Sequence, residues 1–111
     1  MSGTQSEWIE SLSLELRRGV VVLAALSQLR EEQYGYSLKK SLAERGMPID
    51  EGTLYPLLRR LESQELLQSD WRVDGSRPRK YYSLTARGRQ ALDELSAEWK
   101  RLALVMGDLL S

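Results

Sequence analysis

The sequence predicts a mainly α-helical protein with a small β-hairpin, and three observations indicate this fold class. Apolar residues recur at spacings of three and four along most of the chain, which is the period of amphipathic helices. Residues 67–84 instead carry aromatic and other strand-forming residues on both sides of the turn sequence "DGSRP". At 111 residues, the chain is long enough for one hydrophobic core but too short for two.

The first two helices are predicted from apolar spacing. The first spans residues 7–30 and has apolar positions at Leu12, Leu16, Val20, Leu23 and Leu26. Residues 34–37 interrupt this pattern. A short second helix then follows, with Leu38, Leu42 and Met47 as its apolar positions and with Gly46 and Pro48 as a C-terminal stop signal.

The third helix is predicted over residues 50–66, with Asp50 as its N-cap. Its core-facing positions are Leu54, Leu57, Leu58 and Leu61, which fall on one side at 100° per residue. Tyr55 and Arg59 lie on the opposite side, where the folding of a monomer does not require an aromatic ring. This exposed side is therefore a candidate for binding a partner.

Residues 67–84 form the predicted hairpin, with an arginine at its tip, and residues 85–111 form the last helix, which Thr85 can cap. The apolar positions of this helix alternate spacings of three and four, namely Leu92, Leu95, Trp99, Leu102, Met106 and Leu109. Such a seam is typical of a coiled coil, so this helix is expected to pack on the same domain and to mediate dimerisation.

Three helices followed by a basic hairpin describe a winged helix-turn-helix, which is a DNA-binding architecture over residues 1–84. The formal net charge of the chain is zero, which by itself argues against nucleic acid. The charge is unevenly distributed, however. Residues 71–89 contain six cationic residues against Asp74 alone, a net charge of +5. This local patch favours double-stranded DNA as the partner.

The composition also excludes several classes of function. The chain has no cysteine and no histidine, so it lacks thiolate ligands and the commonest general base and zinc ligand. We therefore expect neither an enzyme nor a metal or cofactor. The sequence has no stretch of about 18 uncharged apolar residues and no basic, apolar signal segment, so the expected location is cytoplasmic, without a membrane partner.

Three motifs closely resemble the PadR family of winged-helix transcriptional regulators, over about residues 20–99. They are "YGYSLKKSLAERG", "DEGTLYPLLRRLESQELL" and "SRPRKYYSLTARGRQALDEL". The resemblance implies a bacterial or archaeal homodimer, often a repressor that responds to small molecules, and it suggests the short subgroup with a single C-terminal dimerisation helix. Two positions depart from the family pattern. Tyr34 stands where a histidine is frequent, and Glu65 replaces the glycine usual after the third helix.

The DNA-binding residues expected from the pattern and the resemblance lie on the second helix, the third helix and the hairpin. They are Thr53, Tyr55, Arg59, Arg77, Arg79, Lys80, Lys39 and Lys40. Two alternatives stay open at this point. Tyr55 can instead pack beneath the hairpin, and the cations of the hairpin can simply be solvated.

The expected dimer interface combines the first and last helices, and it is also the candidate site for a small aromatic effector. Its residues are Trp8, Leu12, Leu92, Leu95, Trp99, Leu102 and Met106. Trp99 can serve as an aromatic anchor of this interface, or it can line a flat apolar pocket together with Trp8.

These observations together predict a homodimeric transcriptional regulator that binds a pseudo-palindromic operator. The regulator is expected to be a repressor, and a planar ligand is expected to release it from DNA. The alternative is a winged helix that docks another protein without binding DNA specifically. The zero net charge supports this alternative, whereas the basic hairpin argues against it.

Overall fold

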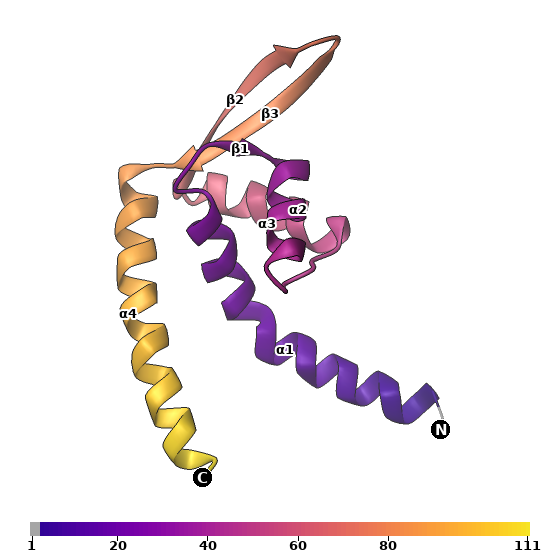
Figure 1. The fold of residues 1–111 in the computed structure, drawn as a ribbon, viewed down its shortest axis with the longest axis vertical. Coiled ribbons are helices and arrows are strands. Elements are labelled where there is room, and N and C mark those ends of the chain that lie inside the picture. Colours follow the sequence, from indigo (N-terminus) through magenta and orange to yellow (C-terminus); the bar gives the residue numbers. More distant parts are fainter. Residues whose placement is uncertain (1–2) are drawn as a thin grey trace.

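The computed structural model describes residues 3–111, with side-chain positions for all of these except residues 3–5 and 74. Within this range the chain is mainly helical and carries one small antiparallel sheet (Figure 1). The elements are α1 (Gly3–Gln28), β1 (Gln33–Tyr34), α2 (Gly35–Glu44), α3 (Glu51–Ser63), β2 (Leu67–Asp74), β3 (Arg77–Leu84) and α4 (Ala86–Leu109).

Helix α1 belongs to the core only in its C-terminal half. It begins earlier and ends slightly earlier than the predicted 7–30, and it bends about halfway along its length (Figure 1). The buried positions of α1 are Val21, Ala25, Leu26 and Leu29. By contrast, Leu12 and Leu16 of the predicted apolar stripe are 52% and 80% exposed. The outer half of α1 therefore presents its apolar residues to solvent.

Helices α2 and α3 form the helix-turn-helix. Helix α2 begins at Gly35, earlier than predicted, and it ends in a Schellman motif in which the Met47 amide donates to the Leu42 carbonyl at 2.8 Å. Gly46 supplies the positive φ of +91° that this motif requires. The connection between the two helices is thus fixed by the backbone.

Helix α3 buries the face that its spacing predicts. Its four core-facing leucines are between 0% and 7% exposed, namely Leu54, Leu57, Leu58 and Leu61. Asp50 occupies the N-cap position, but its carboxylate accepts from the Thr53 hydroxyl at 2.9 Å rather than from a backbone amide. The predicted position of the cap is right, and its predicted hydrogen bond is replaced by this side-chain bond.

Helix α3 ends just before the position where Glu65 replaces the glycine usual in the family. Glu65 has φ = +64°, the conformation that a glycine adopts without strain. The Leu66 amide donates to the Leu61 carbonyl, and the Glu65 amide donates to the Glu62 carbonyl, both at 2.9 Å. These two bonds form a complete Schellman motif. The helix therefore keeps its cap geometry without the glycine, at the expense of local backbone strain.

The sheet has a third strand that the sequence does not reveal. Strands β2 and β3 span the predicted hairpin and pair from Leu67 with Leu84 to Asp74 with Arg77. Strand β1 adds to the other edge of β3, giving the order β1-β3-β2. Two residues are too few to show the alternating pattern of a strand in the sequence. Strand β1 can be recognised only from its pairing with the open edge of β3.

Helix α4 begins on the loop that follows α3. The Thr85 hydroxyl accepts from the Gly88 amide at 3.0 Å, which confirms the predicted N-cap, and it donates to the Glu65 carbonyl at 2.6 Å. Gly88 packs so closely that an added Cβ would lie 2.0 Å from the Leu66 carbonyl oxygen. The start of α4 is thereby tied to the end of α3.

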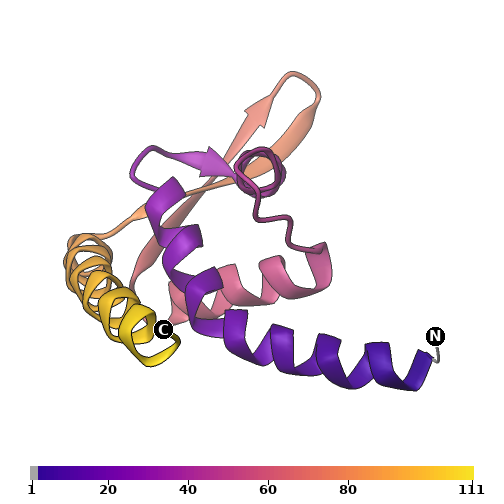
Figure 2. The same ribbon diagram turned by 60° about the horizontal axis from the view of Figure 1, so that its bottom comes forward.

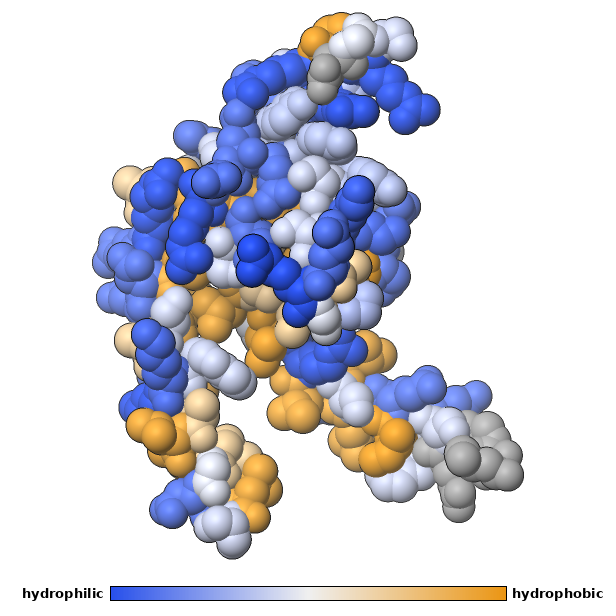
Figure 3. All heavy atoms as spheres, in the orientation of Figure 1, coloured by the Kyte–Doolittle hydropathy of each residue, from blue (hydrophilic) through white to orange (hydrophobic). Residues whose placement is uncertain are grey.

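Beyond this joint, α1 and α4 diverge as two arms (Figures 1 and 2). Apolar side chains gather over the lower parts of both arms (Figure 3). On α4 they include Trp99, Leu102, Val105 and Met106, each between 40% and 48% exposed. Within the described residues, neither arm nor any other helix is both long and apolar enough to cross a membrane.

Candidate nucleic-acid interface

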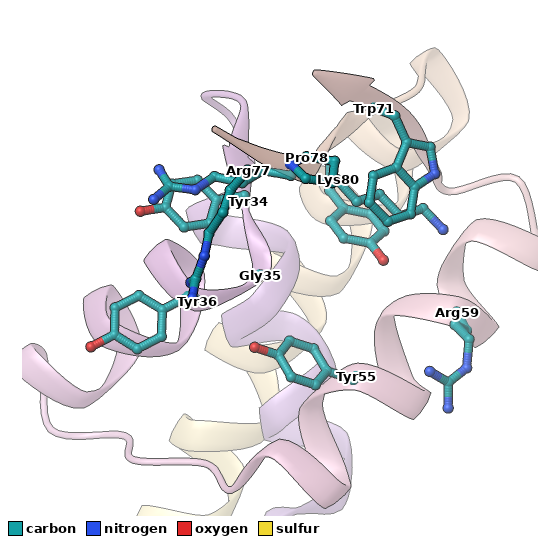
Figure 4. Close-up of a pocket in the computed structure, with 11 residues that line it drawn as sticks. Tyr34, Gly35, Tyr36, Tyr55, Arg59, Trp71, Arg77, Pro78 and Lys80 are labelled. Carbon is teal, nitrogen blue, oxygen red and sulfur yellow. The ribbon is translucent and has the colours of Figure 1, made fainter. Parts of the chain in front are cut away.

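A groove of about 660 Å³ runs between the start of α2, helix α3 and the hairpin (Figure 4). The hairpin of β2 and β3 is called the wing from here on. The groove is lined by Tyr34, Gly35, Tyr36, Tyr55, Arg59, Trp71, Arg77, Pro78, Arg79, Lys80 and Tyr82. Four of these residues are cations, five are aromatic and none is acidic. The lining is therefore suited to an anionic ligand that also presents flat or apolar surface.

Tyr55 forms part of the floor of this groove, where it lies against the start of α2 (Figure 4). A Cβ added to Gly35 would lie 2.6 Å from Cε1 of Tyr55, so the absence of a side chain at Gly35 makes room for the ring. Burial, and then the charge of Glu51, raise the pKa of the Tyr55 hydroxyl. Tyr55 thus packs against the core of the domain and also lines the groove.

The wing is attached to α3 through Glu62. The Glu62 carboxylate accepts from the Ser69 hydroxyl and lies 3.2 Å from the ammonium of Lys80, which also lies over the Tyr82 ring. The Ser69 hydrogen bond, followed by Lys80, lowers the pKa of Glu62. One carboxylate of α3 therefore holds both strands of the wing near its base.

The opposite face of the wing is attached to the loop that precedes β1. Arg72 lies 2.6 Å from Glu32 and 3.2 Å from Asp70. Arg79 stacks on the Tyr34 ring at 4.4 Å, and Tyr34 meets Tyr81 edge to face with ring centres 5.5 Å apart. These contacts fix the wing from its second side and bring the Arg79 guanidinium to the groove.

Folding neutralises part of the basic patch that the sequence indicates. Of its six cations, Arg72 pairs with Glu32, Lys80 pairs with Glu62, and Arg87 lies 3.9 Å from Glu65. The acidic partners come from outside residues 71–89, so a count along the sequence does not include them. The groove keeps its positive character because these carboxylates do not line it.

The structure brings five of the eight predicted DNA-binding residues to the groove, namely Tyr55, Arg59, Arg77, Arg79 and Lys80. It places the other three elsewhere. Thr53 lines a separate hollow of about 580 Å³ between α1 and α3. Lys39 pairs with Glu51 at 3.3 Å, and Lys40 is exposed on the outer side of α2.

The residues predicted for the dimer interface divide into two groups. Six of them are exposed on the arms, namely Trp8, Leu12, Leu95, Trp99, Leu102 and Met106. Leu92 is different, because it is only 3% exposed and belongs to the core of its own chain. Placing Leu92 in the interface is therefore a prediction that the structure corrects. The apolar seam of α4 packs into the chain's own core in the first turns of the helix, and the rest of the seam is exposed.

Sequence reasoning did not assign Trp71, Glu62 or Tyr34 to the site. For Trp71 the sequence gives a partial signal, the alternation of side chains along the predicted strand. Side chains alternate along a strand, so Leu67, Ser69, Trp71 and Val73 share one face of β2. Leu67 is buried and Ser69 contacts α3, which places Trp71 on the face toward α3. Among the described residues, acidic side chains do not cluster where they could hold a metal ion.

Comparison with known proteins identifies the family. The model of the transcriptional regulator PadR-like family matches residues 22–94, which include the helix-turn-helix, the wing and the first turns of α4. The chain belongs to the PadR-like family. This PadR-like protein is accordingly a transcriptional regulator and not an enzyme.

Similar proteins agree over most of the chain. A PadR family regulator from Eggerthella lenta has a solved structure that is 52% identical, with a TM-score of 0.87, covering 99% of this chain and 98% of that one. Transcriptional regulator Rv3488 of Mycobacterium tuberculosis is 41% identical over 72% of this chain and 76% of its own length. Bacillus subtilis PadR, solved in complex with operator DNA, is 26% identical with a TM-score of 0.64, over 68% of this chain and 45% of that one.

Proposed function

We propose that this PadR-like regulator binds a specific operator in double-stranded DNA and represses transcription from it. The observation that carries the proposal is the groove, which combines four cations and five aromatic residues with no acidic residue. Its place between α3 and the wing supports this proposal, because a recognition helix in the major groove leaves the adjacent phosphate backbone beside the wing. The operator complex of the related Bacillus subtilis protein is consistent with this role.

We assign the predicted contacts to two classes. Thr53, Tyr55 and Arg59 lie on α3 and are proposed to act in the major groove and on its rim. Arg77, Arg79 and Lys80 lie on β3 and are proposed to contact phosphates, with Lys80 already held by Glu62. Lys39 and Lys40 of α2 are assigned to flanking phosphates, and Lys39 would have to leave its ion pair with Glu51 to reach one.

We further propose that the regulator acts as a homodimer through the exposed apolar faces of its two arms. A monomer would leave a large apolar surface in water, including Trp8, Leu102 and Met106. A two-fold dimer would bury the same patch from both chains, and it would place the two wings on half-sites of a pseudo-palindrome.

A planar aromatic effector is proposed to bind between the arms, close to Trp8 and Trp99. Both indoles are about half exposed in the single chain, at 56% and 48%. Such a ligand would release DNA if it bound better to a dimer whose wings have the wrong separation. Quenching of tryptophan fluorescence by a panel of flat aromatics, lost in Trp99→Ala, tests this proposal. Absence of quenching by the whole panel would contradict it.

Titration of two labelled duplexes tests DNA recognition. One duplex comes from upstream of the protein's own gene and the other is a shuffled sequence of equal composition, each measured at low and near-physiological salt. Preference for the native duplex at the higher salt is the expected result. Equal binding that collapses with salt would indicate phosphate attraction alone and would favour the alternative, a module that docks another protein.

Sedimentation equilibrium of two matched variants tests the dimer. Leu102 lies on the predicted seam of α4, whereas Leu104 is 78% exposed and lies off it. Leu102→Glu is expected to yield monomers, because it would place a carboxylate in the apolar interface. Leu104→Glu introduces the same charge on the same helix and should leave the dimer intact. A wild-type monomer at micromolar concentration would refute the proposed assembly.

A further inference from the structure

Trp71 is an exposed aromatic residue at the edge of the groove. Its side chain is 65% exposed, and its neighbours on the same face of the wing are Val73 and Pro78, which pair with each other across the strands. Val73 is 76% exposed and Pro78 is also exposed. The wing therefore carries a short apolar strip on the side that faces the recognition helix, beyond the buried contact of Leu67 with the core.

Trp71 and Arg59 line the groove from two different elements, the wing and α3. Figure 4 shows the indole extending from the wing toward α3, and the Arg59 side chain extending from α3 below it. Arg77, Arg79 and Lys80 lie on the neighbouring strand, and no acidic residue lines the groove. An occupant of this space would meet cations and an apolar ring within one short stretch.

A strand of the DNA backbone presents this combination of surfaces. Its phosphates are anionic, whereas the deoxyribose between two phosphates offers carbon atoms and no charge. Proteins that bind the minor groove likewise combine basic side chains with apolar ones at the DNA surface. A protein partner suited to this groove would need acidic residues on both sides of an apolar residue. Every DNA backbone has the equivalent pattern, whereas few protein surfaces do.

We propose that Trp71 packs against a deoxyribose of the operator backbone where it passes between α3 and the wing, with the cations that line the groove on nearby phosphates. The inference rests on the proposed function, since it concerns the same groove. It adds a contact that is apolar, and such a contact does not release counterions. Its contribution to affinity is therefore independent of salt, in contrast to that of the arginines.

The experiment compares Trp71→Ala with Arg77→Ala on the operator duplex, across a series of salt concentrations. Trp71→Ala is expected to weaken binding about tenfold for each half-site at every salt concentration, with an unchanged slope of log K against log salt. Arg77→Ala is expected to lower that slope by about one for each half-site. Trp71→Phe keeps an aromatic ring and should retain most of the affinity.

The possible outcomes separate the inference from the proposed function. Wild-type affinity in Trp71→Ala would overturn the inference and leave operator binding in place. A reduced salt slope in Trp71→Ala would also overturn it, because the tryptophan would then act by placing phosphate contacts. Failure of the wild-type protein to prefer its operator would overturn both. Because Trp71 is exposed, thermal unfolding of Trp71→Ala should match wild type, and a lower melting temperature would contradict the assignment of a free surface residue.

Discussion

Substitution of Glu65 by glycine is predicted to stabilise the protein. Glu65 holds the left-handed position of the Schellman motif that ends α3, with φ = +64°. A residue with a Cβ pays about 1–2 kcal/mol in this conformation, whereas glycine does not. Glycine in turn loses about 0.5–1 kcal/mol more conformational entropy on folding. The difference leaves a gain of about 0.5–1 kcal/mol for Glu65→Gly.

Thermal unfolding at equal protein concentration measures this gain. For a chain of 111 residues, a gain of that size corresponds to a rise of about 2–4 °C in Tm. Glu65→Ala is the matched control, because it also removes the carboxylate near Arg87 but keeps the Cβ. That exposed pair contributes little, so the alanine variant should remain close to wild type.

The comparison of the two variants isolates the backbone contribution. If Glu65→Gly were no more stable than Glu65→Ala, the left-handed residue would carry no strain and the reasoning would be wrong. A gain shared by both variants would instead point to the charge of Glu65. The expected result is a gain in the glycine variant alone.

Two further predictions concern the joint with α4 and the base of the wing. Gly88→Ala should destabilise the protein by about 1–3 kcal/mol, measured by chemical unfolding, because the added Cβ would lie 2.0 Å from the Leu66 carbonyl oxygen. Helix propensity alone predicts the opposite sign, since alanine is the better helix former. The hydrogen bond from Ser69 is the main cause of the lowered pKa of Glu62. The Glu62 carboxylate should therefore stabilise the fold fully at pH values above its ordinary pKa of 4.5, and this stabilisation should be lost as the pH falls through its lower pKa in the folded protein. Glu62→Gln should therefore flatten the acid limb of the stability profile, and an unchanged limb would refute this role.

Features that depend on nearby residues could be predicted from the sequence. Leu54 and Leu61 are buried as their spacing predicts, because helical period is set by contacts three and four residues apart. Thr85 caps α4 for the same reason, since an N-cap bonds an amide within the first turn. The turn sequence at Asp74 likewise determined where β2 and β3 meet.

The candidate site was predictable in part. The cations and Tyr55 were identified from the exposed side of α3 and the basic wing, and the structure brings five of them to one groove. Trp71 was not identified, because its face on the strand becomes meaningful only once the position of α3 is known. The position of the Tyr55 ring depends on Gly35, which lies twenty residues earlier in the chain.

Which charged and apolar side chains remain available for binding depends on how distant segments pack together. Glu32 and Glu62 neutralise Arg72 and Lys80 across separations that no local pattern encodes. Leu92 shares the spacing of the exposed seam, yet folding buries it in the chain's own core. Periodicity and capping act over one or two turns, whereas ion pairs, strand β1 and the groove arise where the path of the chain brings distant segments together.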